Sequence, residues 1–85
     1  MNKKELNNIR KEFNEVLKKE KEYTIPSSFF YKWIECIKAS SSYDAWIDAL
    51  EKYIWNDPFY IKHGSAYCRF LELEYKNRNR IVKLI

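Results

Sequence analysis

The central part of the chain reads Phe30-Tyr31-Lys32-Trp33-Ile34-Glu35-Cys36-Ile37. Its largest apolar residues follow the i, i+3, i+4, i+7 spacing of one face of an α-helix: Phe30, Trp33, Ile34 and Ile37. Pro26 stands before this stretch and favours an extended backbone at Ile25. Ser27 or Ser28 is then expected to cap a helix of about ten residues, because a serine hydroxyl accepts from the first free N–H groups.

The preceding segment, from about Lys3 to Glu22, is predicted to be a long amphipathic helix. Its apolar residues recur along one face: Leu6, Ile9, Phe13, Val16 and Leu17. Asn2 is expected to cap it, with Glu5 three residues later in a variant of the capping box. Homodimerisation through this face is an open option, although little over two heptads is short for an independent coiled coil.

Two more helices are expected after the serine run 40–42. A serine of this run caps the first, whose apolar stripe is Trp46, Ile47, Leu50, Tyr53 and Ile54. Asn56-Asp57-Pro58 ends that helix, and Asp57 as cap with Pro58 in the first turn begins a short one. Gly64 is the only glycine, and we expect it to end the short helix in a left-handed conformation.

The last segment admits two interpretations. With Ser65 as cap, a helix fits the apolar residues Tyr67, Phe70, Leu71 and Tyr75. Residues 69–75 also partly alternate and 81–85 are strand-like, so a β-hairpin is the minority alternative; its turn lacks the favoured Asn-Gly pair. The predicted fold class is all-α: one domain over residues 1–85, as a compact bundle of four to five helices. It comprises the N-terminal helix 3–22, a helical core 27–75 and a basic segment 76–85.

Length and composition favour a single small intracellular domain. A chain of 85 residues is enough for one domain and too short for two. The N-terminus has no apolar signal region, and no apolar run would cross a bilayer, so a cytoplasmic location without membrane association is expected. In that reducing compartment Cys36 and Cys68 would be free thiols in or near the core.

Few residues offer catalytic chemistry, so a non-enzymatic protein without cofactor or metal is expected. His63, the only histidine, and Cys68 would form a conceivable nucleophile pair, but no oxyanion loop or orienting partner is identifiable. Asp44, Asp48 and Glu51 share one helix face and, with Asp57, would suit a divalent cation; a solvated helix face explains the same pattern. No phosphate loop, zinc spacing or dinucleotide fingerprint is present.

The positive charges gather at the two ends of the chain, which suits a nucleic-acid backbone. The net charge is +4. The candidate contacts are Lys76, Arg78, Arg80 and Lys83 at the C-terminus and Lys3, Lys4, Arg10 and Lys11 at the N-terminus. The second and third helices have the lengths of a helix–turn–helix, but three outward carboxylates on the would-be recognition helix disfavour contact with DNA there. Solvated charged ends explain the same pattern.

Aromatic residues make up 18% of the chain, more than one small core can hold, which favours a protein-binding surface. Trp55, Phe59 and Tyr60 flank the turn at Pro58 and are expected to form one exposed patch. The competing explanation is that these aromatic residues cover the rim of the core.

From Phe30 to Leu73 the chain resembles the YozE family of SAM-like bacterial proteins. Phe30-Tyr31-Lys32-Trp33-Ile34 is similar to the opening aromatic motif of that family. Pro58 with Leu71-Glu72-Leu73 is similar to its Pro…Tyr-Leu-Glu-Leu stretch, with Phe70 in the place of the tyrosine. The chain adds an N-terminal helix and lacks the family's C-terminal acidic, Trp-containing motif. The resemblance implies a compact helical bundle and carries no functional residue.

The sequence thus predicts a small interaction protein that binds a protein partner. Its type resembles accessory, adaptor or inhibitor proteins of phages and mobile elements. The alternative is a nucleic-acid-binding accessory protein that uses the basic N-terminal helix and C-terminal tail. No small-molecule substrate is evident.

Overall fold

Five helices make up the computed structural model, which describes residues 1–85. They are α1 (Lys3–Lys19), α2 (Ser27–Lys38), α3 (Tyr43–Tyr53), α4 (Pro58–Lys62) and α5 (Gly64–Val82). The all-α prediction is confirmed. The hairpin alternative is wrong, because residues 64–82 form a single α-helix. The first helix ends at Lys19 rather than Glu22.

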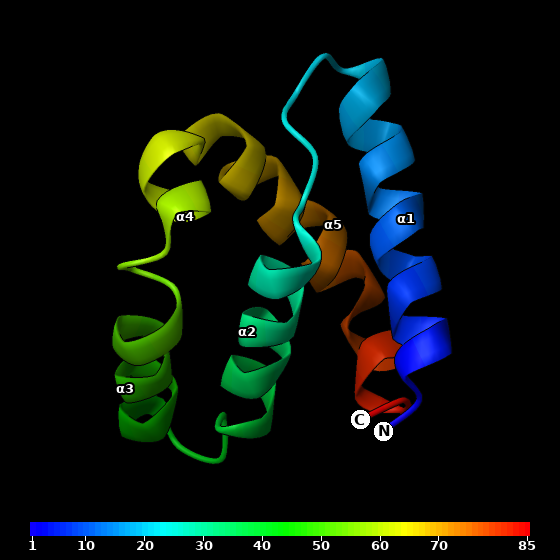
Figure 1. The fold of residues 1–85 in the computed structure, drawn as a ribbon. Helices are drawn as coiled ribbons and strands as arrows, with labels where there is room; N and C mark the ends of the chain where they lie inside the picture. Colours follow the sequence, from blue (N-terminus) through cyan, green and yellow to red (C-terminus); the bar gives the residue numbers. More distant parts are fainter.

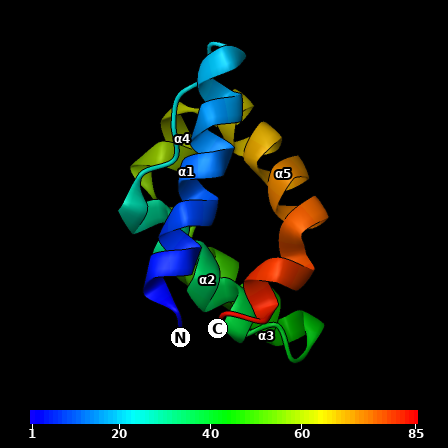
Figure 2. The same cartoon turned by 90° about the vertical axis from the view of Figure 1, so that its right-hand side faces the viewer.

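The helices are arranged as an antiparallel α2–α3 hairpin on one side and α1 with α5 on the other (Figure 1). α4 closes the end opposite the two termini, and α5 returns from it along α1 (Figures 1 and 2). The termini therefore meet, and the N–H of Asn2 donates to the carbonyl of Leu84 at 2.8 Å.

The core is centred on Phe70 of α5, which is fully buried. Its ring packs against rings of α1 and α2, with centroids 5.5 to 6.4 Å apart and planes nearly perpendicular: Phe13, Phe29, Phe30 and Trp33. Edge-to-face pairs of this kind contribute about 0.5–1.5 kcal/mol beyond the area they bury. One residue of α5 thereby joins three helices.

Three of the expected helix caps are confirmed. Asn2 accepts from the N–H of Glu5, and Ser42 accepts from the N–H of Ala45. Asp57 accepts from the N–H of Phe59 and pairs with Lys32 of α2 at 2.6 Å, so it also ties the α3–α4 turn to α2.

The other expected helix ends are wrong. Pro26 rather than a serine occupies the cap position of α2, where its extended conformation turns the chain and no side chain caps. Gly64 is not left-handed; it is the first residue of α5. Ser65 does not cap α5, because its hydroxyl donates to the carboxylate of Glu22 in the segment between α1 and α2.

The left-handed residue in this structure is Lys21, two residues after the end of α1. The N–H of Lys21 donates to the carbonyl of Lys18, and the N–H of Glu22 donates to that of Leu17, which together form a Schellman motif. The motif turns the chain back towards α2.

Asn14 fixes the returning segment against α1. Its side chain is buried and bonds both backbone groups of Ile25: it accepts from the N–H at 2.7 Å and donates to the carbonyl at 3.2 Å. Arg10 donates to the same carbonyl at 2.9 Å. Because Ile25 is itself buried, these bonds satisfy backbone groups that water cannot reach.

We predict that Asn14→Ala lowers the free energy of unfolding by about 2 kcal/mol, because it leaves the buried N–H of Ile25 without an acceptor. Asn8→Ala is the matched control: the same substitution at an exposed site of α1, with an expected effect within about 0.5 kcal/mol. Urea unfolding followed by circular dichroism measures both. Equal losses for the two variants would show that the Asn14 bonds contribute nothing.

Candidate functional site

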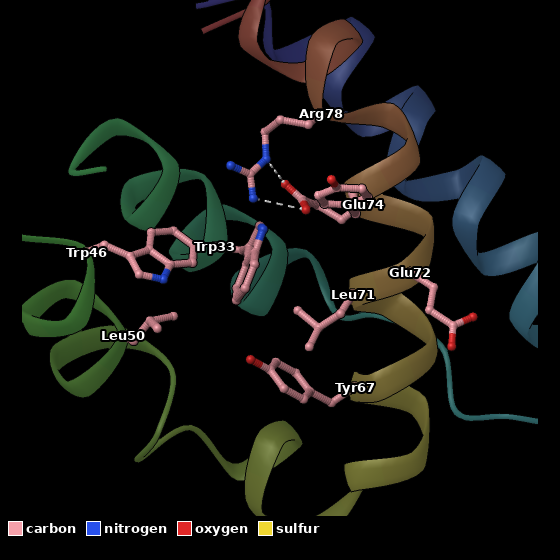
Figure 3. Close-up of a pocket in the computed structure, with 9 residues that line it drawn as sticks. Trp33, Trp46, Leu50, Tyr67, Leu71, Glu72, Glu74 and Arg78 are labelled. Atoms are coloured by element: carbon pink, nitrogen blue, oxygen red, sulfur yellow. Dashed lines mark hydrogen bonds and ion pairs between the residues drawn. The ribbon is translucent and has the colours of Figure 1, made fainter. Parts of the chain in front are cut away.

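A groove of about 510 Å³ opens between α3 and α5, with α2 as its floor (Figure 3). It exists because α3 packs mainly on α2 and only weakly on α5. Its lining residues are Trp33 from α2, Trp46 and Leu50 from α3, and Tyr67, Leu71, Glu72, Glu74, Tyr75 and Arg78 from α5. Its size and its mostly apolar lining with a few polar groups are typical of a binding site.

The two apolar walls come from helix faces that the core leaves uncovered. On α5, Tyr67, Leu71 and Tyr75 stand four residues apart, next to the face that carries Phe70 into the core. The stripe of α3 is also only partly covered, since Trp46 remains half-buried. Apolar surface is thus presented to solvent from both sides of the groove.

An ion pair forms one end of the groove. Glu74 is 1% exposed and accepts from the Nε and Nη2 atoms of Arg78, one turn further along α5. The guanidinium carbon of Arg78 also lies 5.8 Å from the ring centroid of Trp46, which brings α5 to α3 at this end. The pair leaves no net charge there, and the Nη1 group of Arg78 makes no hydrogen bond within the chain.

Trp33 supplies a hydrogen-bond donor without an acceptor. Its side chain is 2% exposed, and its Nε1 is the only buried side-chain nitrogen or oxygen atom in the structure that has no partner. Figure 3 shows this nitrogen at the edge of the ring that faces Arg78 and Glu74.

The hydroxyl of Tyr67 lies at the other end of the groove and points into it (Figure 3). Burial, with a smaller contribution from Tyr60, raises the pKa of Tyr67 to about 12. The hydroxyl makes no hydrogen bond to another residue. The polar groups of the groove are thus the Arg78–Glu74 pair, an indole N–H, a neutral hydroxyl and, at the rim, Glu72, which pairs with Arg69.

The patch expected from Trp55, Phe59 and Tyr60 does not form. Trp55 is 39% exposed, but Phe59 is 6% exposed and packs on Phe29 with ring centroids 4.8 Å apart. Tyr60 is half-buried and meets Tyr67 edge-on. The expectation fails because Pro58 begins a helix whose first turn directs the Phe59 ring inward.

Three of the expected nucleic-acid contacts are arginines that bind within the chain. Arg78 pairs with Glu74, and Arg10 bonds to the carbonyl of Ile25. Arg80 makes a two-pronged pair with Glu12 of α1 at 3.0 and 3.1 Å. The hydrogen bond from Arg80 holds the pKa of the Glu12 carboxyl below its ordinary value. Arg69 of α5 pairs in turn with Glu20, the residue after α1. The hydrogen bond from Arg69 lowers the pKa of the Glu20 carboxyl.

The expected lysine contacts make no ion pair in the structure: Lys3, Lys4, Lys11, Lys76 and Lys83. Since Asn2 bonds to Leu84, the neighbouring Lys3 and Lys83 lie at the same end of the molecule.

The remaining candidate groups lie apart from the groove. His63 stacks on Tyr23 with ring centroids 3.8 Å apart, and Cys68 is exposed rather than in the core. Cys36 is buried, which raises the pKa of its thiol to about 11. No three metal-ligating side chains come together, and Asp57 pairs with Lys32 instead of joining Asp44, Asp48 and Glu51.

The apolar face of α1 is covered within the chain. Leu6, Ile9 and Phe13 are buried against the other helices, so homodimerisation through this face is incompatible with the fold.

No protein-family model matches the sequence, and no curated protein or solved structure is significantly similar to it. The resemblance of residues 30–73 to the YozE family stays a prediction. None of the five helices has the length and apolar character needed to cross a membrane.

Proposed function

We propose that this chain is a small, non-enzymatic interaction protein that binds a segment of a protein partner in the groove between α3 and α5. The observation that carries the proposal is the open apolar surface made by Trp46, Leu71 and Tyr75, beneath which lies the buried, unpaired indole donor of Trp33. Grooves between two helices commonly receive one apolar face of a peptide segment.

The composition of the groove supports binding to protein. Tryptophan, tyrosine and arginine are the residues most enriched among interface hot spots, and all three line this groove. Its aromatic rings are held in place by core contacts: Trp33 packs against Phe70, and Tyr67 packs against Phe29. Preorganised rings lose little side-chain entropy when a partner arrives.

Binding rather than catalysis is supported by the hydrogen bonds and burial of the groove's polar groups. Both carboxylate oxygens of Glu74 accept from Arg78, and burial raises the pKa of the Tyr67 hydroxyl to about 12. A general base or nucleophile needs a group that is free to exchange a proton near the working pH. These groups instead provide fixed hydrogen-bonding positions around an apolar centre.

We predict that peptides selected from a random display library on the wild-type protein bind Leu71→Lys at least about tenfold more weakly. The substitution places a charged group in the apolar wall and removes buried area. Ile61→Lys is the matched control: Ile61 is 64% exposed on α4, outside the groove, and its replacement should change affinity less than about twofold.

Fluorescence anisotropy of the labelled peptides measures all three affinities, and circular dichroism verifies that each variant is folded. Selected peptides that bind wild-type and Leu71→Lys equally, or a library that yields no binder, would contradict the groove as a protein-binding site.

A second candidate function, nucleic-acid binding, is favoured by the position of the lysines. The fold brings Lys3, Lys4 and Lys83 to one end of the molecule, although they lie at opposite ends of the sequence. Unpaired ammonium groups gathered in this way suit phosphate contact. The paired arginines Arg78 and Arg80 suit it less, because their carboxylate partners compete with phosphate.

We predict for this candidate that removing Lys3, Lys4 and Lys83 together reduces the salt dependence of binding to DNA. Each lost phosphate contact lowers the slope of log K against log salt by about 0.7–0.9. Anisotropy of labelled single- and double-stranded DNA at several salt concentrations measures the slope. Lys38, Lys52 and Lys62, each replaced by alanine, give a control of equal charge. Equal slopes for both triple variants, or no binding at low salt, would reject the candidate.

A further inference from the structure

The unpaired N–H of Trp33 indicates that the partner must place a hydrogen-bond acceptor in the groove. A buried donor without an acceptor costs about 1–3 kcal/mol of stability, and such groups are rare in folded proteins. A phenylalanine at this position would place an aromatic ring in the core without bringing a donor that needs an acceptor. The indole places its Nε1 beside the Arg78–Glu74 pair at the end of the groove (Figure 3).

The surrounding charges select the kind of acceptor. Glu74 uses both carboxylate oxygens on Arg78, and the pair is already neutral. A partner carboxylate at this position would add a second negative charge beside a 1% exposed one, where water screens little. A neutral carbonyl oxygen accepts from Trp33 without that cost and can also use the free Nη1 of Arg78.

We propose that the occupant of the groove is a peptide segment that places a large apolar side chain between Leu50 and Leu71 and a neutral carbonyl oxygen on Trp33 Nε1. This inference rests on the proposed protein-binding function and adds the chemistry of the partner. The hydroxyl of Tyr67 gives a second neutral contact at the other end.

The requirement for a free carbonyl narrows the form of the segment. In the middle of an α-helix each backbone carbonyl is already bonded within the helix, whereas the last four carbonyls of a helix and those of an extended segment are free. The last turn of a partner helix or an extended strand therefore fits, as does an asparagine or glutamine side chain.

The test uses two small probes that carry the same ring: phenylacetamide, with a neutral carbonyl, and phenylacetate, with a carboxylate. Nuclear magnetic resonance of the isotope-labelled protein follows the indole N–H of Trp33 and the methyl groups of Leu50 and Leu71. We expect phenylacetamide to shift all three groups, with the Trp33 indole proton moving downfield as it gains an acceptor. Phenylacetate should bind at least about fivefold more weakly.

Trp33→Phe removes the donor and keeps an aromatic ring. It should weaken phenylacetamide binding by about fivefold, the contribution of one hydrogen bond. Trp55→Phe is the matched control, because Trp55 is 39% exposed and lies outside the groove; its replacement should change the affinity less than about twofold. Since Trp33→Phe also alters the core, the indole shift of the wild-type protein stands as an independent measurement.

The outcomes separate this inference from the proposed function. Methyl shifts at Leu50 and Leu71 without a shift of the Trp33 indole, or equal binding of the two probes, would overturn the inference and leave the groove as a binding site. Absence of any groove shift with either probe, together with failure of the peptide selection, would overturn both.

Discussion

The packing of Phe70 is the constraint on which the rest of the structure depends. This ring joins α5 to α1 through Phe13 and to α2 through Phe29 and Trp33. A chain of this length has room for one buried layer of large side chains. α5 packs on α1 and reaches α2 through Phe70, while its neighbouring apolar face, with Tyr67 and Leu71, stays apart from α3. α3 is held mainly by α2, and the contact between Arg78 and Trp46 links it to α5.

The groove follows from this division of contacts. Two neighbouring faces of α5 have different roles: Phe70 turns into the core, while Leu71, the next residue, remains on the groove wall. The Arg78–Glu74 pair keeps one end of the groove polar, and the burial of Glu74 depends on that pairing, since an unpaired carboxylate would be strongly disfavoured there. The site is thus a by-product of a small aromatic core that covers only part of its helices' apolar surface.

The fold was largely predictable from sequence because helix periodicity and caps are local. The apolar stripe of α2 and the caps at Asn2 and Asp57 are readable from residue spacing alone. The expectation for Gly64 was wrong because a glycine can begin a helix as well as end one. The left-handed residue is Lys21, and it is identified only by the two hydrogen bonds that close the end of α1. The site was not predictable. The stripe of Trp46 and Leu50 looks like core in sequence, and only the tertiary contacts reveal which apolar faces stay uncovered. A surplus of aromatic residues was the available signal, but it does not say which rings are exposed.

The most direct test of the central claim, that the groove between α3 and α5 receives a partner segment, is to locate a bound peptide by nuclear Overhauser effects. The protein is isotope-labelled, the peptide selected on it is unlabelled, and only contacts between the two are recorded. The account predicts contacts from the peptide to the side chains of Leu50, Tyr67 and Leu71. Contacts confined to other surfaces, such as Ile61 on α4 or the lysines beside the termini, would contradict it.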